Sequence, residues 1–178
     1  MNLPNKLSLT RIALIPVMVA LMYPNTTVCN LLAAVVFALA AFTDFLDGHI
    51  ARKQHIVTDF GKFVDPVADK LLVLSALIML IQQGLMLAWV VVVILARELC
   101  VDGLRMVAGS KGMVIAAGKL GKIKTTVQIV LILWLMLSRQ PVMGSIISGA
   151  LTLLVLVMTL WSGVEYFRNN RSVISTMK

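Results

Sequence analysis

Long apolar stretches separated by short polar breaks make up almost all of this chain of 178 residues. Six of the stretches approach the roughly 20 apolar residues that an α-helix needs to cross a bilayer. The pattern predicts membrane-spanning helices at about 9–24, 30–50, 60–83, 86–106, 125–140 and 142–165. The start of the chain mixes polar and apolar positions, and so we expect residues 2–10 to form an amphipathic segment at the membrane surface, with Lys6 and Arg11 at the interface.

The composition supports the same class of fold. Sixty per cent of the residues are hydrophobic, and the mean hydropathy is +0.95. A soluble globular domain is closer to half apolar, so this chain is too apolar for that class. We therefore expect an all-α integral membrane protein with six transmembrane helices and an N-terminal interfacial segment, forming one domain over residues 1–178.

Basic residues occur in alternate polar breaks. Fifteen of the sixteen Lys and Arg residues lie in the N-terminal segment, in 52–70, in 97–124 or in the C-terminal tail, while Arg139 is the exception. By the positive-inside rule these segments and both termini are cytoplasmic. This topology explains the net charge of +8 and favours contact with anionic membrane lipids. No basic face is interleaved with aromatic residues, so we expect no nucleic-acid partner.

Acidic residues are concentrated in one stretch, since five of the eight lie between positions 44 and 69. Two pairs stand out, Asp44 with Asp47 and Asp65 with Asp69. At spacings of three and four, the members of each pair share one face of a helix. The polar segment 52–58 between the pairs is typical of a tight helical connection. A hairpin would place the pairs at similar depths, and this predicts one cluster of four carboxylates.

Four clustered carboxylates raise each other's pKa and are costly to bury without a compensating cation. Their faces carry no His or Cys, so the ligands are hard oxygens suited to Mg²⁺ or Mn²⁺ rather than zinc. Two such ions about 4 Å apart can clamp the attacking and leaving oxygens of a phosphoryl displacement. The sequence therefore predicts a divalent-metal site, with two ions.

Small residues accompany the acidic pairs, at Gly48, Ala51 and Gly61. They could serve only to let membrane helices pack closely. Beside carboxylates they also let a bulky ligand approach the backbone. Arg52 follows Gly48 by four positions and offers a planar donor fork for phosphate.

The run Asp44-x-x-Asp47-Gly48-x-x-Ala51-Arg52, followed after eight residues by Gly61-x-x-x-Asp65-x-x-x-Asp69, resembles the signature of the CDP-alcohol phosphotransferases. The resemblance implies a six-helix membrane enzyme, often a homodimer, that cleaves a CDP-linked substrate with divalent metal. It makes Asp44, Asp47 and Asp65 metal ligands, and Asp69 both a metal neighbour and the catalytic base. The residues it implies around the cytidine diphosphate are Gly48, Ala51, Arg52, Gly61 and, as a hydroxyl near the nucleotide, Thr58.

A second basic region is similar to the bacterial, inner-membrane branch of this family that forms phosphatidylglycerophosphate. The similar segments are Arg97-Glu98, Gly103-Leu104-Arg105, 116–125 and the opening Pro4-Asn5 with Arg11. The resemblance implies CDP-diacylglycerol as donor, sn-glycerol 3-phosphate as acceptor and CMP as product. Ser8 stands where the family usually has Thr, and Asp102 where it more often has a small or neutral residue. Asn5 and Ser8 are candidates for an N-terminal wall of the site.

The same region carries cations suited to an anionic acceptor. The candidates for binding the acceptor phosphate are Arg97, Arg105, Lys119, Lys122 and Lys124. The lysines could instead serve only to set topology as loop residues. Arg97 and Arg105 lie within a predicted span, where charge is expensive and tends to face a polar interior. We expect Glu98 to pair with one of these arginines in a structural role.

Two alternatives remain at the level of sequence. Acidic residues within spans also mark ion pathways, so a divalent-cation transporter is a rival. The carboxylates other than Glu165 lie between positions 44 and 102, and the outer halves of the spans lack a continuing polar ladder. That distribution favours a pocket open to one side. Within the enzyme class, serine, inositol phosphate or a lipid alcohol could replace glycerol 3-phosphate as acceptor.

Overall fold

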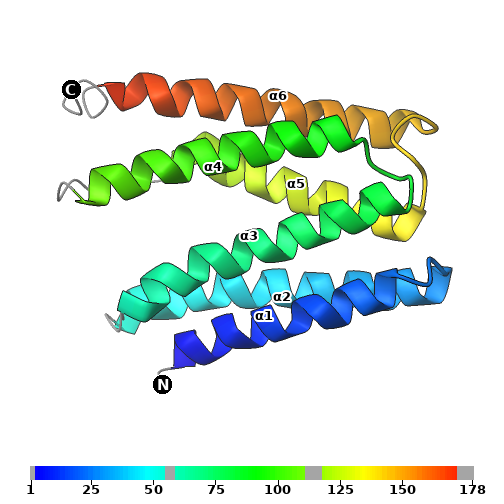
Figure 1. The fold of residues 1–178 in the computed structure, drawn as a ribbon, viewed down its shortest axis with the longest axis horizontal. Helices are drawn as coiled ribbons and strands as arrows, with labels where there is room; N and C mark the ends of the chain where they lie inside the picture. Colours follow the sequence, from blue (N-terminus) through cyan, green and yellow to red (C-terminus); the bar gives the residue numbers. More distant parts are fainter. Residues whose placement is uncertain (1–2, 55–58, 111–117, 172–178) are drawn as a thin grey trace. The chain divides into compact units, whose positions relative to one another are not determined.

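The chain is helical throughout the part that the structure describes. This computed structural model describes residues 3–54, 59–110 and 118–171, and the side chains of 3–7, 44–54, 59–66, 110 and 119 lie outside that description. The helices, shown in Figure 1, are α1 (Leu3–Met22), α2 (Thr27–Gln54), α3 (Asp59–Gln82), α4 (Ala88–Ser110), α5 (Lys119–Ser138) and α6 (Ile146–Asn169). The described ranges contain no strand. The predicted all-α class is confirmed.

Two helices among the described residues are long and apolar enough to cross a membrane: Leu120–Ser138 of α5 and Ile146–Asn169, which is α6. Helix α6 leaves Ile146 and Trp161 largely exposed, as suits contact with lipid chains. These features agree with the membrane protein that the sequence predicts. The number of six spans remains a prediction.

Several helix boundaries differ from the predicted ones by a few residues, and two of the differences bear on candidate site residues. Helix α2 continues to Gln54, so Arg52 lies in its last turn and not in the connection. Helix α5 begins at Lys119, and the carbonyl of Gly118 accepts a hydrogen bond from the backbone N–H of Lys122. The lysines of this segment are therefore helical residues and not loop residues. Lys, Arg and Gln are good helix formers, so a helix can continue beyond its apolar stretch until a glycine or turn ends it.

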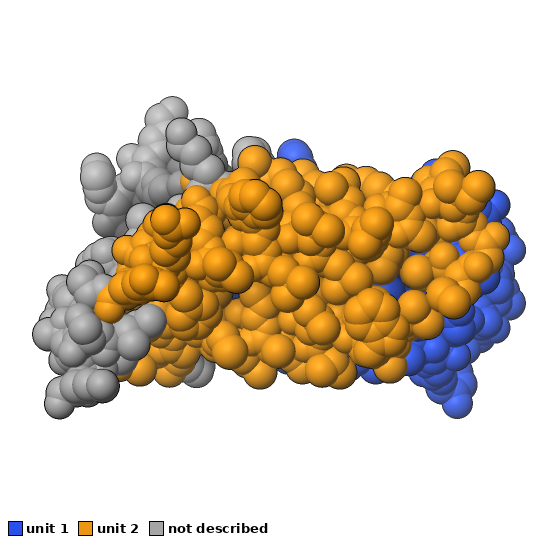
Figure 2. All heavy atoms as spheres, turned by 90° about the horizontal axis from the view of Figure 1, so that it is seen from above, with its two compact units in different colours: residues 1–86, 132–141 blue, residues 87–131, 142–178 orange. Residues whose placement is uncertain are grey.

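The six helices belong to two compact units, coloured separately in Figure 2. Unit 1 comprises residues 1–86 and 132–141, which include α1, α2, α3 and the C-terminal end of α5. Unit 2 comprises residues 87–131 and 142–178, which include α4, α6 and the larger part of α5. The acidic pairs therefore belong to unit 1 and the second basic region to unit 2.

In unit 1, α1 packs against both α2 and α3, which also contact each other. Side chains from all three helices are fully buried, with Met18 and Met22 from α1, Phe37 from α2, and Leu77 and Leu80 from α3. In a membrane, such close packing stabilises the helices through van der Waals contacts. This three-helix core holds the two acidic helices in fixed relation.

Arg11 differs from its predicted place at the membrane interface. Its side chain is only 1% exposed, and its Nε donates to the carbonyl oxygen of Ala40 on α2 at 3.3 Å. A buried guanidinium is costly unless it finds polar partners, and the carbonyl oxygen of Ala40 is one such partner. The interfacial assignment of Arg11 is wrong.

A polar cluster joins the helix ends of unit 1 at the turn between α1 and α2. Gln83 donates to the carbonyl oxygen of Met22 at 2.7 Å and to Oδ1 of the buried Asn30 at 2.9 Å. Arg139 donates to the carbonyl oxygen and to Oδ1 of Asn25, at 2.8 and 2.9 Å. Met22 ends α1, so the glutamine satisfies a carbonyl that has no partner within its own helix.

In unit 2, α4 packs against α6. Val101, Leu104 and Ala108 of α4 are buried with Tyr166 of α6, and Phe167 packs against this cluster. The rings of Tyr166 and Phe167 meet edge to face, with their centroids 6.5 Å apart. This apolar cluster fixes the register of α4 against α6, which matters for the arginines described below.

Candidate functional site

The four predicted metal ligands lie on two packed helices of unit 1. Asp44 and Asp47 are on α2, and Asp65 and Asp69 are on α3. The described side chains contain no group of three His, Cys, Asp or Glu residues that could hold a metal, but of these four only Asp69 has a described side chain. Asp69 is half-buried and takes part in polar interactions.

The prediction that all four aspartates lie on helices is confirmed. On an α-helix, residues three or four apart place their Cβ atoms about 5–6 Å from each other. Each pair therefore presents two carboxyl-bearing positions on one helix face. Convergence of the two pairs on one cluster remains a prediction, because the side chains of Asp44, Asp47 and Asp65 lie outside the described residues.

The predicted nucleotide-pocket residues follow the same helices. Gly48, Ala51 and Arg52 lie on α2, and Gly61 lies on α3, so the four-residue spacing from Gly48 to Arg52 places both on one helix face. The surroundings of their side chains lie outside the described residues, as does Thr58 altogether. Their role in binding cytidine diphosphate is not tested by the structure.

Helix α1 brings a buried polar face to α2 beside the first acidic pair. Ser8 and Arg11, three residues apart, are almost fully buried, and Asn5 precedes Ser8 by another three, with its side chain outside the described residues. The Ala40 carbonyl that receives Arg11 also accepts from Thr43 Oγ1 at 2.8 Å.

Ala40 precedes Asp44 by four residues, which is about one helical turn. Arg11 therefore reaches α2 one turn before the first acidic pair, a placement that the sequence reasoning missed. The three-residue spacing of Asn5, Ser8 and Arg11 was the available signal.

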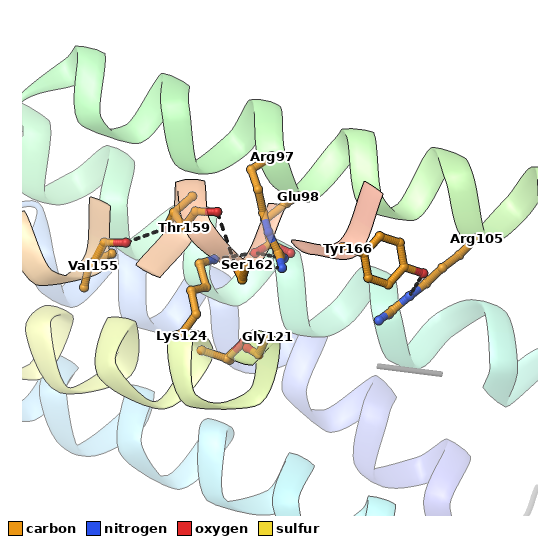
Figure 3. A network of polar contacts seen from close by, with 10 residues as sticks. Arg97, Glu98, Arg105, Gly121, Lys124, Val155, Thr159, Ser162 and Tyr166 are labelled. Carbon is orange, nitrogen blue, oxygen red and sulfur yellow. Dashed lines mark hydrogen bonds and ion pairs between the residues drawn. The ribbon is translucent and has the colours of Figure 1, made fainter. Parts of the chain in front are cut away.

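In unit 2, Glu98 of α4 stands between two cations (Figure 3). Its Oε1 accepts from Arg97 Nη1 at 3.3 Å and from Lys124 Nζ of α5. Lys124 is only 1% exposed, whereas Glu98 is 23% exposed. The expected pairing of Glu98 with an arginine is confirmed, and Lys124, predicted as an acceptor ligand, is engaged by the same carboxylate.

Arg97 is also held from α6. Its Nη2 donates to Ser162 Oγ at 3.0 Å, while Nε is buried without a hydrogen-bond partner among the described residues. Two glycines leave room for the side chain. A Cβ at Gly163 would lie 3.3 Å from Arg97 Cγ, and one at Gly121 would lie 3.6 Å from Arg97 Nη2.

Arg105, eight residues after Arg97 on α4, contacts α6 in a similar way. Its Nε donates to the hydroxyl oxygen of Tyr166 at 3.1 Å. Its guanidinium carbon lies 5.4 Å from the centroid of the Tyr166 ring, within range of a cation–π interaction. Ser162 and Tyr166 carried no signal in the sequence, since hydroxyl side chains on an apolar helix do not reveal which neighbour they face.

The remaining predicted acceptor ligands lie on the first turns of α5. Lys122 is exposed, and Lys119 has its side chain outside the described residues. Both are on the helix that also bears Lys124. The structure therefore separates the five predicted cations into two arginines held by α6, one buried lysine paired with Glu98, and two lysines at the start of α5.

Comparison with known proteins gives a consistent family. Residues 1–161 match the family model described as CDP-alcohol phosphatidyltransferase. A protein of Bacillus subtilis is 46% identical over 189 aligned positions, covering 98% of both chains. Proteins of Rickettsia typhi and Shigella flexneri serotype 5b are each 38% identical, covering 94% and 96% of this chain and 96% of each relative. All three relatives are named CDP-diacylglycerol--glycerol-3-phosphate 3-phosphatidyltransferase.

Proposed function

Because the chain belongs to the CDP-alcohol phosphatidyltransferase family, we propose that it transfers the phosphatidyl group of CDP-diacylglycerol to sn-glycerol 3-phosphate. The primary hydroxyl oxygen of the acceptor forms a bond to the phosphorus that carries the diacylglycerol. The bond from that phosphorus to the oxygen of CMP breaks, and the hydroxyl proton is lost. The products are phosphatidylglycerophosphate and CMP, which places the reaction in the synthesis of anionic phospholipids.

One observation supports this proposal above the others. The carboxylate pattern that resembles the family signature falls on α2 and α3 with its three- and four-residue spacings on continuous helix. Relatives matching nearly the whole chain are named for the same donor and acceptor. The substrates therefore follow from agreement between a local pattern and similarity over the full length.

A divalent metal fits the donor chemistry of unit 1. Members of this family generally depend on a divalent metal. The residues that would hold it are Asp44, Asp47, Asp65 and Asp69, whose carboxylate oxygens suit Mg²⁺ or Mn²⁺. Bound there, two such ions would neutralise the pyrophosphate and the charge that develops on the departing CMP.

Asp69 accepts the proton of the attacking hydroxyl in this mechanism, as the base of the reaction. It is half-buried on α3. A carboxylate beside metal is a weak base, so positioning of the acceptor contributes more to the rate than proton transfer does.

The remaining residues bind and orient the two substrates. The cytidine diphosphate is contacted by Gly48, Ala51, Arg52, Thr58 and Gly61, where the absence of large side chains admits the nucleotide and Arg52 donates to phosphate. Asn5 and Ser8 form the N-terminal wall. The acceptor phosphate is bound by cations taken from Arg97, Arg105, Lys119, Lys122 and Lys124.

The cellular setting of the enzyme is part of the proposal. The chain is a multi-pass protein of the bacterial inner membrane, with both termini and the catalytic residues on the cytoplasmic side, as the distribution of its basic residues indicates. It works as a homodimer. Its donor is a membrane lipid, and its acceptor and CMP are water-soluble.

A CMP-release assay with a panel of acceptors tests the proposal. Purified protein with CDP-diacylglycerol and Mg²⁺ should release CMP with glycerol 3-phosphate and much more slowly with serine, inositol phosphate or a lipid alcohol. A preference for one of those acceptors would reject the assigned substrate and keep the chemistry. Metal flux into liposomes, without CMP release on any acceptor, would instead favour the divalent-cation transporter.

A further inference from the structure

Two arginines of α4 and two hydroxyl residues of α6 form matched pairs at different spacings. Arg97 and Arg105 are eight residues apart, which corresponds to about 12 Å along a helix. Their partners Ser162 and Tyr166 are four residues apart, or about 6 Å. Both arginines reach to these partners on α6, and so their side chains converge: the guanidinium groups lie closer together than the backbone positions of the two arginines (Figure 3).

The contacts to Arg97 fix the direction of its guanidinium group. The Ser162 hydroxyl donates its proton to the carbonyl oxygen of Thr159 at 3.2 Å, so its oxygen is oriented to accept from Arg97 Nη2. Glu98 accepts from Nη1 on the other side. With Gly163 against the side-chain stem, the arginine has one well-defined position.

Tyr166 holds Arg105 through Nε, the nitrogen next to the side-chain stem, and through its ring. An arginine held at Nε presents its two terminal nitrogens as a planar fork, the geometry that suits a bidentate phosphate. The tyrosine is itself buried in the apolar cluster between α4 and α6, so the anchor is rigid.

The charges of this group also suit an anion. Glu98 interacts with both Arg97 and Lys124, so these three residues together carry one net positive charge, and Arg105 adds a second. The almost fully buried Lys124 shares the negative charge of Glu98 with Arg97, so that the carboxylate does not cancel the whole charge of Arg97. Asp102, three residues before Arg105 on α4, offsets part of this charge, and the remaining net positive charge still suits an anion such as a phosphate monoester.

Other hydroxyls of α6 show what a purely structural role looks like. Thr152 and Thr159 are buried, and each donates to a carbonyl of its own helix, at 2.8 and 2.6 Å. Such bonds satisfy the hydroxyl within the helix and need no partner. Ser162 and Tyr166 instead accept from charged donors of α4, which is the arrangement expected of residues that orient those donors.

We propose that Ser162 and Tyr166 are positioning residues that set the spacing and direction of Arg97 and Arg105 for a phosphate monoester, the phosphate of the acceptor. The identity of the acceptor rests on the proposed function. The positioning role predicts a loss of affinity for the acceptor that leaves binding of the lipid donor unchanged.

Steady-state kinetics of Ser162→Ala, Tyr166→Phe and the double variant test this role, with CMP release as the assay. Each single variant should raise KM for glycerol 3-phosphate about tenfold, the loss typical of one hydrogen bond to a charged group. It should also weaken inhibition by inorganic phosphate. KM for CDP-diacylglycerol should stay within about twofold, the scatter expected of a substitution that does not touch that substrate.

Two further variants separate positioning from stability. Ser162→Thr keeps the hydroxyl and should retain most of the affinity for acceptor. Thr152→Val removes a hydroxyl whose hydrogen bond, among the described residues, lies within α6, and it should change neither KM. Size-exclusion chromatography and thermal unfolding in detergent check the fold of each protein. If Ser162→Ala does not fold, the kinetics of Tyr166→Phe test the positioning role by themselves, since this variant removes one oxygen and keeps the ring.

Unchanged KM for glycerol 3-phosphate in the folded variants, or an equal rise of KM for both substrates, would overturn the positioning role while the proposed function stands. A wild-type chain that releases CMP with a different acceptor and not with glycerol 3-phosphate would reject the proposed function, and the assignment of the phosphate with it.

Discussion

Asp69 is the member of the four-carboxylate set whose side chain the structure describes, half-buried on α3. Replacing it by Asn removes the proposed base and one negative charge at nearly constant volume. We expect kcat for CMP release to fall by about 10²–10⁴, the contribution typical of a positioned base. Asp59→Asn is the matched control, because it makes the same change at the start of the same helix and outside the acidic pattern.

Asp59→Asn should retain near wild-type kcat, and both variants should elute as folded protein. Near-normal turnover of Asp69→Asn would show that another group takes the proton. If both variants lost activity, the loss in Asp69→Asn could not be assigned to the chemistry of the Asp69 carboxylate, because removing another negative charge from α3 would have the same effect.

Glu98 provides a test of stability at the same scale, since it pairs with the buried Lys124 and with Arg97. Glu98→Gln leaves the ammonium group without its anionic partner. The free energy of unfolding should fall by about 1–3 kcal/mol, as for other buried groups that lose a charged hydrogen-bond partner. Thermal unfolding in detergent measures this loss.

Glu165→Gln serves as the control, because Glu165 forms no ion pair with the described residues. Adding Lys124→Gln to Glu98→Gln should restore part of the lost stability, since the cation that lost the Glu98 carboxylate is then removed. Destabilisation that is fully additive would show that the two side chains are not coupled.

At the scale of elements, the polar cluster at the helix ends of unit 1 predicts a purely structural effect. Gln83→Ala removes one of the donors to the Met22 carbonyl oxygen and one of the hydrogen-bond partners of the buried Asn30. We expect a loss of about 1–3 kcal/mol in the free energy of unfolding. The kcat per folded molecule should not change. Gln82→Ala, at the exposed neighbouring position, should leave both quantities unchanged, and equal losses for the two variants would contradict this role of Gln83.

Much of the element order could be predicted, because apolar runs of membrane length are a strong signal in sequence. The structure has six helices at the predicted places, within the residues it describes. The ends of α2 and α5 were predicted poorly, since a helix of good formers does not stop where its apolar stretch stops.

The candidate site was predictable where residue types and spacings carry the chemistry, as in the acidic pattern of α2 and α3. It was not predictable where a contact depends on helix register. Nothing in the sequence indicated that Ser162 and Tyr166 would face the arginines of α4, or that Lys124 would be buried against Glu98. Arg11 was assigned to the interface because single-helix reasoning does not show which neighbour can receive a charge.

At the scale of the whole molecule, the charge distribution predicts which ends of the helices are cytoplasmic. A cysteine introduced at Gln82, beside the turn after α3, should react with a membrane-impermeant maleimide added to intact cells. A cysteine at His55, between α2 and α3, should react only after the cells are broken. Cys29 and Cys100 are replaced by Ser beforehand. The reverse labelling pattern would invert the proposed topology.

The central claim is that this chain joins the phosphatidyl group of one substrate to glycerol 3-phosphate. Purified protein is incubated with radiolabelled glycerol 3-phosphate and CDP-diacylglycerol, and the label is followed into the organic phase. Label should enter lipid in a one-to-one ratio with CMP released, should stop when EDTA removes divalent metal, and should resume when Mg²⁺ or Mn²⁺ is restored in excess. Release of CMP without label in the lipid would contradict the claim.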